Sequence, residues 1–183
     1  LTGSGVDGIH HGIVKLETGT TTTGSGTIAL QPDPNVSYRG AVSLHDTDVT
    51  TIEVLFRLDA LPTAAQNYEF RVGLSDRAFT STADSCRMML IWDGTSSSIS
   101  IGIQNVVASV STTEWVDNFT GISAITWHHV RLVMTTTAQT LYIDGVLAVS
   151  SSNAASSEVM NPCITLVKSA GITEVSALID LFW

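Results

Sequence analysis

Charged residues are scarce in this chain of 183 residues, and basic residues are the scarcest. Asp, Glu, Lys and Arg together make up 14% of the sequence, where about 25% is usual. There are 8 Lys and Arg against 17 Asp and Glu, so the net charge is −9. Nucleic acids and anionic membrane surfaces both attract proteins through clustered Lys and Arg. We therefore expect neither nucleic acid nor a membrane among the partners.

Cysteines and long apolar runs are also few. Two cysteines, Cys86 and Cys163, cannot define a disulfide scaffold. Each lies in or beside an apolar segment, which favours two buried thiols, with one bridge between neighbouring strands as the alternative. No stretch reaches the run of about 18 apolar residues that a membrane span needs, and the first residues lack the features of a signal peptide. Because the chain begins with Leu1, we expect a processed product or a piece of a larger polypeptide.

Hydrophobic and hydroxyl-bearing residues are abundant instead. Hydrophobic residues make up 44% of the chain, the mean hydropathy is +0.28, and there are 24 Thr and 21 Ser. This composition is far from the low hydrophobicity and high charge of disordered chains. The length fits one domain with a sizeable core, and we expect its surface to be largely hydroxyl rather than ionic.

Short runs of β-branched and aromatic residues recur along the chain, and helix signals are nearly absent. About ten strands in one domain indicate an all-β fold, either two packed antiparallel sheets or a barrel. The predicted strands are 26–30, 49–58, 68–75, 86–92, 98–104, 127–135, 140–143, 146–150, 163–168 and 177–182. An Asp144-Gly145 pair between two apolar runs predicts a tight hairpin there.

The alternation of residue types assigns side chains to the inner or outer face of each strand. In the strand at 49–58, Ile52, Val54 and Phe56 are predicted to face the core. The outward positions of other strands hold residues that could do chemistry, namely Arg71, Gln104, Trp127, His129, Arg131 and Tyr142.

The first part of the chain has a low-complexity character. We expect residues 1–25 to form a flexible arm or linker and residues 26–183 to form the sandwich. We also expect residues 27–30 to supply a first strand that pairs with the C-terminal strand.

The sequence W-H-H-V-R-L-V at 127–133, followed by L-Y-I-D-G-V at 141–146, resembles the concanavalin A-like lectin/glucanase superfamily. Within it, the pattern is similar to laminin G-like modules, and residues 51–57 and 177–182 resemble two further strands of these modules. The resemblance covers about residues 49–183 and implies a two-sheet antiparallel β-sandwich of the jelly-roll type. It does not define an activity, because this sandwich carries lectins, adhesive modules, glycosidases and polysaccharide lyases.

A second, looser resemblance lies at residues 10–20, whose His-His-Gly start and Thr/Gly continuation are similar to segments of bacteriophage tail-fibre and other virion surface proteins. It implies a location on a virion surface or outside the cell. It also implies that other subunits of a larger assembly, including copies of the same chain, are partners.

The residues required for catalysis in this superfamily are incomplete. The E-x-D-x-x-E run of its glucanases is absent, and Glu53 stands alone in its strand. A polysaccharide lyase needs cationic or amide groups and a proton-transferring Tyr or His, which Arg71, Gln104, His129 and Tyr142 could provide. However, the R-T-E-[LV], Q-I-H and Y-F-K-A-G motifs of alginate lyases are missing. We therefore expect no enzyme, with a lyase acting on a uronate-containing polymer as the alternative.

Metal binding has only scattered candidates. Calcium prefers oxygen ligands from loops, and modules of this kind often hold one at the rim of the sandwich. The candidate ligands are Asp46, Asp48, Asp93, Asp117 and Asn118. They form no recognisable ligand string, so we expect no cofactor and leave the binding of calcium open. His128 and His129 are adjacent on a strand and therefore cannot chelate one ion.

Sugar binding needs a flat apolar surface flanked by amide and carboxylate groups. Trp115, Asp117 and Asn118 have this composition. The outward residues predicted to join them in contacting carbohydrate are Arg71, Gln104, His129 and Arg131. The sequence thus predicts a non-catalytic recognition or structural module of a virion that binds cell-surface carbohydrate. A purely structural virion or decoration protein without a ligand is a further alternative.

Overall fold

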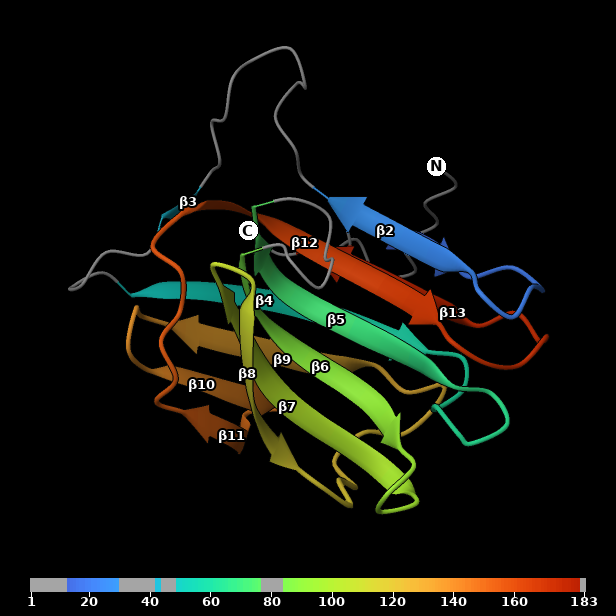
Figure 1. The fold of residues 1–183 in the computed structure, drawn as a ribbon. Helices are drawn as coiled ribbons and strands as arrows, with labels where there is room; N and C mark the ends of the chain where they lie inside the picture. The colour runs from blue at the N-terminus through green and yellow to red at the C-terminus, as the bar shows by residue number, and fades with distance from the viewer. Residues whose placement is uncertain (1–12, 30–41, 44–48, 77–83, 182–183) are drawn as a thin grey trace, which may run out of the picture.

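The computed structural model describes residues 13–29, 42–43, 49–76 and 84–181, and in these ranges the chain forms strands and no helix (Figure 1). In the same ranges, no helix is long and apolar enough to cross a membrane. The strands are β1 (Ile13–Glu17), β2 (Ser25–Ala29), β3 (Val42–Ser43), β4 (Thr50–Leu58), β5 (Tyr68–Ser75), β6 (Ser85–Asp93), β7 (Ser98–Val107), β8 (Val110–Val116), β9 (His128–Met134), β10 (Gln139–Ile143), β11 (Val146–Ser151), β12 (Val159–Lys168) and β13 (Ser176–Leu181).

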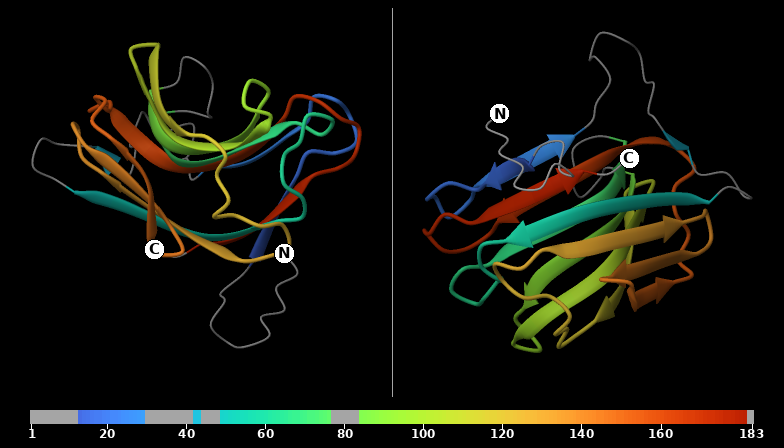
Figure 2. Two further views of the ribbon diagram at one scale, coloured as in Figure 1. Left: turned by 90° about the horizontal axis from the view of Figure 1, so that it is seen from below. Right: turned by 180° about the vertical axis from the view of Figure 1, so that it is seen from behind.

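The strands form two antiparallel sheets. One has the order β1-β13-β4-β9-β10-β11, and the other has the order β2-β12-β5-β6-β7-β8 with β3 beside β12. Seen from the end, the sheets are two curved layers, and the outer face of the sheet that contains β5, β6 and β7 is concave (Figure 2). The expected all-β fold, a two-sheet antiparallel sandwich of the jelly-roll type, is confirmed.

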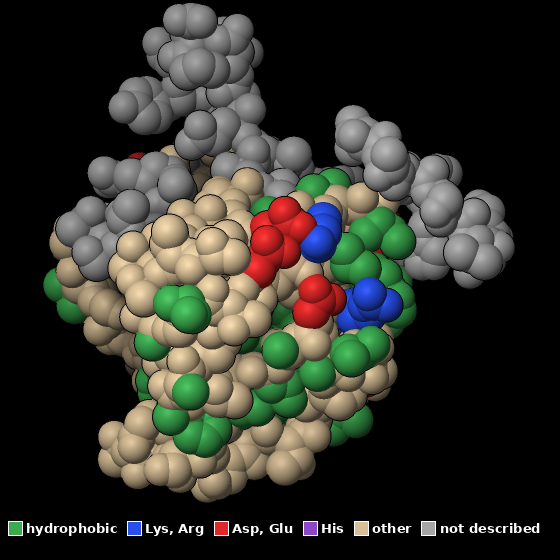
Figure 3. Space-filling model, turned by 90° about the vertical axis from the view of Figure 1, so that its right-hand side faces the viewer, with side chains coloured by type: hydrophobic (Ala, Val, Ile, Leu, Met, Phe, Trp, Pro, Cys, Tyr) green, Lys and Arg blue, Asp and Glu red, His purple; other side chains and the backbone are tan. Residues whose placement is uncertain are grey.

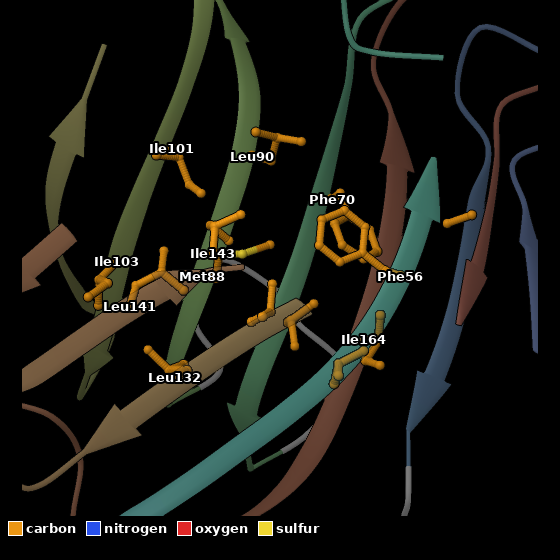
Figure 4. Close-up of a cluster of buried hydrophobic side chains, with 14 of the residues drawn as sticks. Phe56, Phe70, Met88, Leu90, Ile101, Ile103, Leu132, Leu141, Ile143 and Ile164 are labelled. Carbon is orange, nitrogen blue, oxygen red and sulfur yellow. The ribbon is translucent and has the colours of Figure 1, made fainter. Parts of the chain in front are cut away.

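The hydrophobic core fills the space between the sheets (Figure 4). Phe56 from β4 and Phe70 from β5 meet there, with ring centroids 4.9 Å apart and ring planes 34° apart. Their neighbours include Met88, Leu90, Ile101, Ile103, Leu132, Leu141, Ile143 and Ile164. These residues occupy every second position of their strands, so the predicted inward faces are confirmed for β4, β5, β7 and β9.

The N-terminal part differs from the expectation. β1 lies within the predicted arm and pairs with β13, so the sandwich already includes residues 13–17 rather than starting at 26. β2 pairs with β12, from Cys163↔Ala29 to Val167↔Ser25, so the expected pairing of residues 27–30 with the C-terminal strand is wrong. The Thr/Gly-rich segment is the loop that carries the chain from one sheet to the other. The segment that resembles tail fibres lies partly outside the described residues.

The sequence analysis also missed β8. It follows β7 through a turn in which Ala108 and Ser109 have φ angles of 49° and 69°. Tight hairpins of this kind usually contain Gly or Asn, so the turn lacked its usual signal. β8 is also an edge strand with mostly exposed side chains, and it therefore shows no apolar alternation.

A buried lysine joins the loops at one end of the sandwich. The side chain of Lys168 is 2% exposed, and its ammonium group donates hydrogen bonds to the carbonyl oxygens of Gly19 (2.7 Å) and Thr173 (3.1 Å). It thus connects the β1–β2 loop to the β12–β13 loop. A buried charge is tolerated because these carbonyl groups replace its hydration.

We expect Lys168→Met to lower the free energy of unfolding by about 1.5–3 kcal/mol, the contribution of hydrogen bonds to a charged group. The substitution keeps the aliphatic length but removes the two donated bonds. Chemical denaturation would measure the change. Lys15→Met is the matched control, since Lys15 is half-exposed and pairs with Glu17 at the surface, and a much smaller change is expected there. Equal effects of the two substitutions would contradict this role of Lys168.

The two cysteines are both buried and are not joined by a disulfide bond, as expected. Burial raises the pKa of the Cys86 thiol to about 12, so the reactive thiolate is suppressed at pH 8.

We expect Cys86 to resist iodoacetamide in the folded protein at pH 8 and to react rapidly in denaturant. Because the pKa is raised on folding, the corresponding stabilisation is present below about pH 8.5 and is lost as the pH rises toward 12. Peptide mapping after alkylation measures the reaction at Cys86 separately. Fast native labelling of Cys86 would be incompatible with its burial.

Candidate functional site

The concave outer face of β5, β6, β7 and β8 brings together side chains from distant parts of the sequence. In an antiparallel sheet, residues paired across strands point to the same side and form rows perpendicular to the strands. The first row is Thr165, Arg71, Met89, Gly102 and Trp115. The second row is Cys163, Gly73, Arg87, Gln104 and Thr113. The next outward positions hold Val167, Glu69, Ile91, Ser100 and Asp117.

Two arginines lie on neighbouring strands of this concave face. Arg71 of β5 donates from Nε to Glu69 Oε2 at 2.9 Å, and its Nη2 pairs with the same oxygen. Arg87 of β6 donates from Nε to Gln104 Oε1 at 2.8 Å, and Gln104 Nε2 donates to Thr113 Oγ1 at 3.3 Å. These bonds hold the planes of both guanidinium groups in fixed orientations.

Arg87 is almost completely buried. Burial and, next, the neighbouring Arg71 lower the pKa of its guanidinium to about 10, while Glu69 acts in the opposite direction. A pKa of about 10 leaves Arg87 charged at neutral pH. The centre of the concave face therefore holds two arginines, and Glu69 pairs with one of them, Arg71.

Trp115 of β8 supplies an aromatic surface at the edge of this face. It pairs with Gly102, and a Cβ atom at Gly102 would lie 2.6 Å from Trp115 Cε3. The indole ring therefore lies over Gly102, in space that any other residue type would occupy. The residue is 38% exposed, so part of the indole is accessible to a ligand.

Asp117 and Asn118 follow directly after β8. Ser100 Oγ donates to Asp117 Oδ1 at 2.7 Å, and the backbone amide of Asn118 donates to Ser98 Oγ at 3.2 Å. Both residues are exposed at the end of the strand that carries Trp115. The structure thus brings five of the predicted contact residues to one face or its rim: Trp115, Asp117, Asn118, Arg71 and Gln104.

His129 and Arg131 do not belong to this group, although they were predicted with it. They lie with Tyr142 on the outer face of the opposite sheet, where Arg131 stacks 4.2 Å from the Tyr142 ring centroid. His129 Nε2 lies 2.9 Å from Glu53 Oε2. The combination of Arg71, Gln104, His129 and Tyr142 that a lyase would need is therefore divided between two faces of the molecule. Alternation had identified all four as outward, but it could not distinguish one sheet from the other.

His128 points into the core, as its alternation with His129 predicted. Its Nδ1 lies 2.7 Å from Asp144 Oδ2, and its Nε2 accepts a hydrogen bond of 3.0 Å from the backbone amide of Ser123. Ser123 Oγ is 3.4 Å from the same nitrogen. Because the Ser123 amide already occupies Nε2, this arrangement anchors the loop before β9 rather than activating the hydroxyl group.

No group of three or more potential metal ligands occurs among the residues that the structure describes. Asp93 accepts hydrogen bonds from the amides of Thr95 (2.9 Å) and Ser96 (3.1 Å) in its own turn, and these bonds lower the pKa of its carboxyl group. Two other calcium candidates, Asp46 and Asp48, lie outside the described residues.

Three residues of the concave face were not anticipated from the sequence: Arg87, Met89 and Gly102. Arg87 and Met89 lie at the start of an apolar run, 88–92, in which residue types do not alternate and so mark no outward face. Arg87 pairs with Gln104, a predicted contact residue, but this pairing can be inferred only when the register between β6 and β7 is known. The long hairpin between these strands could have provided the register.

Solved structures with the same fold include proteins with different roles. The carbohydrate recognition domain of Emp46p in its potassium-bound form superposes with a TM-score of 0.59 and 11% identity, over 93% of this chain and 88% of that one. An endo-β-1,4-glucuronan lyase from the fungus Trichoderma reesei has a TM-score of 0.61 and 12% identity, over 92% and 79%. A β-glucanase from Bacillus licheniformis has a TM-score of 0.51 and 12% identity, over 86% and 76%.

No protein-family model and no curated protein matches the chain. At identities of 11–12%, the structural comparisons define the fold alone. That fold is the jelly-roll sandwich of concanavalin A-like lectins and glucanases, as the resemblance implied.

We expect Gly102→Ala to displace the Trp115 ring, because the new methyl group would lie 2.6 Å from the ring and 2.7 Å from the Glu114 carbonyl oxygen. Overpacking of this kind costs about 1–3 kcal/mol of folding free energy. Tryptophan emission and its quenching by acrylamide should both change. Gly94→Ala is the control, since nothing lies within 4 Å of a Cβ atom at Gly94. Unchanged fluorescence in Gly102→Ala would show that the ring does not lie over this glycine.

Proposed function

We propose that this chain is a non-catalytic carbohydrate-binding module whose ligand lies across the concave face of β5–β8. The single observation that carries the proposal is the row that runs from Arg71 through Met89 and Gly102 to Trp115. It combines an aromatic surface, an apolar floor and polar groups on one concave sheet face. Sugars offer matching features, with apolar ring faces surrounded by hydroxyl groups. The occurrence of this fold in a carbohydrate recognition domain supports the proposal.

The extent of the face indicates the size of the ligand. The polar groups span four neighbouring strands, and three interstrand spacings of about 4.8 Å amount to about 14 Å. This distance is longer than one pyranose ring. An oligosaccharide or polysaccharide chain, lying across the strands, therefore fits better than a single sugar.

The described residues of the concave face favour binding over catalysis. A glycosidase needs two carboxylates on either side of the scissile bond, but Glu69 is held by Arg71 and Asp117 lies at the other edge, just after β8. A lyase needs a group that removes a proton, and His129 and Tyr142 lie on the opposite sheet. The same fold occurs in a glucuronan lyase, so product formation must be tested directly.

We further propose that the module is exposed on a virion or outside the cell, within an assembly that contains copies of this chain. The surface composition supports this proposal. On the side drawn in Figure 3, charged side chains occupy a small part of the surface of the described residues, and most of that surface is hydrophobic side chains, uncharged polar side chains or backbone. Together with the net charge of −9, such a surface resists nonspecific adhesion to polyanions and membranes. The resemblance of residues 10–20 to tail-fibre segments is the second support.

We expect Trp115→Ala to weaken glycan binding at least tenfold, because exposed tryptophans in binding sites often contribute 2 kcal/mol or more. A glycan array would identify ligands, and calorimetry would measure the affinities. Trp127→Ala is the matched control, since Trp127 lies near Arg57 on the other sheet and should leave binding unchanged.

Two results would contradict the proposed function. Failure to retain any glycan on the array would favour a purely structural protein. Release of unsaturated or hydrolysed oligosaccharides during incubation would instead identify an enzyme.

A further inference from the structure

We propose that β8 pairs with β8 of a second copy of this chain, antiparallel and about a two-fold axis between the two Thr113 residues. The pairing joins the two concave faces into one surface. What this means for the glycan rests on the proposed function, whereas the contact between the copies does not depend on it. Three features of β8 carry the proposal: its free edge, its two exposed valines and the order of its residues.

β8 has an edge without a neighbouring strand. It is the last strand in the order of its sheet, and all seven of its residues pair with β7 in one regular register. Proteins usually block such edges with Lys, Pro or a β-bulge. β8 contains no Lys and no Pro, and no bulge interrupts its pairing with β7. Within the described part of the chain, this edge is therefore able to accept another strand.

The free backbone groups of this edge belong to Ser111, Thr113 and Trp115. The turn that leads into β8 has two residues and is closed by the pair Val107↔Val110. The pair that closes such a turn exchanges both of its hydrogen bonds, and bonded and non-bonded pairs then alternate along the strands. Val110 and every second residue after it are thus bonded to β7. The residues between them direct their N–H and C=O groups away from β7.

A two-fold axis at Thr113 makes this edge complementary to itself. Thr113 then lies opposite Thr113 of the second copy, and Ser111 lies opposite Trp115 of the second copy, so the outward backbone groups are all paired. On the other side of the sheet, Val110 lies opposite Val116 of the second copy. These two valines are 66% and 38% exposed in the single chain, and the pairing removes apolar surface from water.

The single charge of β8 favours this register over the neighbouring ones. With the axis at Thr113, Glu114 lies opposite Thr112 of the second copy. An axis at Glu114 would place two carboxylates directly opposite each other, which is destabilising. An axis at Thr112 would place Val110 opposite Glu114. The order V-S-T-T-E-W-V therefore favours the register in which the valines meet.

The contact is small and closed. Each copy contributes one strand, so the buried area is below that of a standard interface, and we expect association that depends on concentration. The same edge is used on both copies, so this contact ends at two chains and does not continue into a fibre.

The second copy would also contribute to the proposed glycan site. In this register, Trp115 of the second copy lies opposite Ser111, four residues along β8 from Trp115 of the first copy. Four residues of a strand span about 14 Å. The two indole groups would thus share one surface, at a separation that an oligosaccharide can bridge. A single disaccharide would contact only one of them.

Sedimentation equilibrium of the full chain measures the association. We expect the mass to rise from 19.4 kDa toward twice this value as the protein concentration increases from micromolar to millimolar. Val110→Lys should weaken the association about tenfold or more, because each contact would place an ammonium group against a valine. Ile172→Lys is the matched control, since Ile172 is 71% exposed in the β12–β13 loop and should not affect the mass. A mass of 19.4 kDa at every concentration would overturn the proposal, whether the edge is free or another segment covers it.

The substitution Thr113→Cys tests the register. At the proposed axis the two Cα atoms would lie about 5.5 Å apart, within the range of a disulfide bond. We expect mild oxidation to produce a covalent dimer. Thr112→Cys is the matched control, because the two copies of residue 112 would be diagonal neighbours about 7–8 Å apart and should cross-link at least about tenfold more slowly. Cys86 and Cys163 are buried and do not interfere. Equal cross-linking at both positions, or none at Thr113→Cys, would rule out this register.

The outcomes separate the pairing from the proposed function, because neither experiment contains a glycan. A chain that stays monomeric and binds a glycan overturns the pairing alone. A dimer that retains no glycan overturns the carbohydrate-binding proposal alone. If both hold, Val110→Lys should weaken binding of a long oligosaccharide and leave that of its disaccharide unchanged; equal effects on the two would contradict a shared site.

Discussion

The packing of the two inner sheet faces against each other is the constraint on which the rest of the structure depends. Phe56 and Phe70, from opposite sheets, meet in the centre of a continuous apolar layer. Burial of this layer supplies most of the driving force for folding. Because side chains alternate along a strand, the residues between the buried ones must point outward. The side chains of the concave face are therefore determined together with the core, because they occupy the alternate positions of the same strands.

The concave face combines rigidity with accessibility. Its side chains come from the interior of β5–β8, where the antiparallel hydrogen bonds fix the backbone, rather than from flexible loops. Two glycines shape the surface: Gly102 lets the indole of Trp115 lie over the sheet, and Gly73 lets the backbone of Arg87 approach closely. A rigid surface of this kind loses little conformational entropy when a ligand binds. The arrangement suits recognition of an extended chain better than chemistry at one bond.

Much of the site could be anticipated residue by residue but not as a group. Alternation correctly identified Arg71 and Gln104 as outward, and it did the same for His129 and Arg131. Outward residues of a sandwich lie on one of two opposite surfaces, however, and a period of two does not distinguish them. Arg87 was missed for a related reason, since its importance depends on the partner Gln104 that it meets 17 residues later. β8 escaped prediction because its hairpin turn uses Ala108 and Ser109.

The sequence by itself determined the all-β class, most of the strands, the inward faces and the Asp144-Gly145 hairpin, because these features depend on residues close together in the chain. Only the tertiary structure decided that β1 pairs with β13 and β2 with β12, and which outward residues share a face. The physical reason is that strand pairing joins segments far apart in the sequence through backbone hydrogen bonds, which all residue types except proline form alike. The rows on the concave face follow from that register, and so does the juxtaposition of Arg71, Arg87 and Trp115.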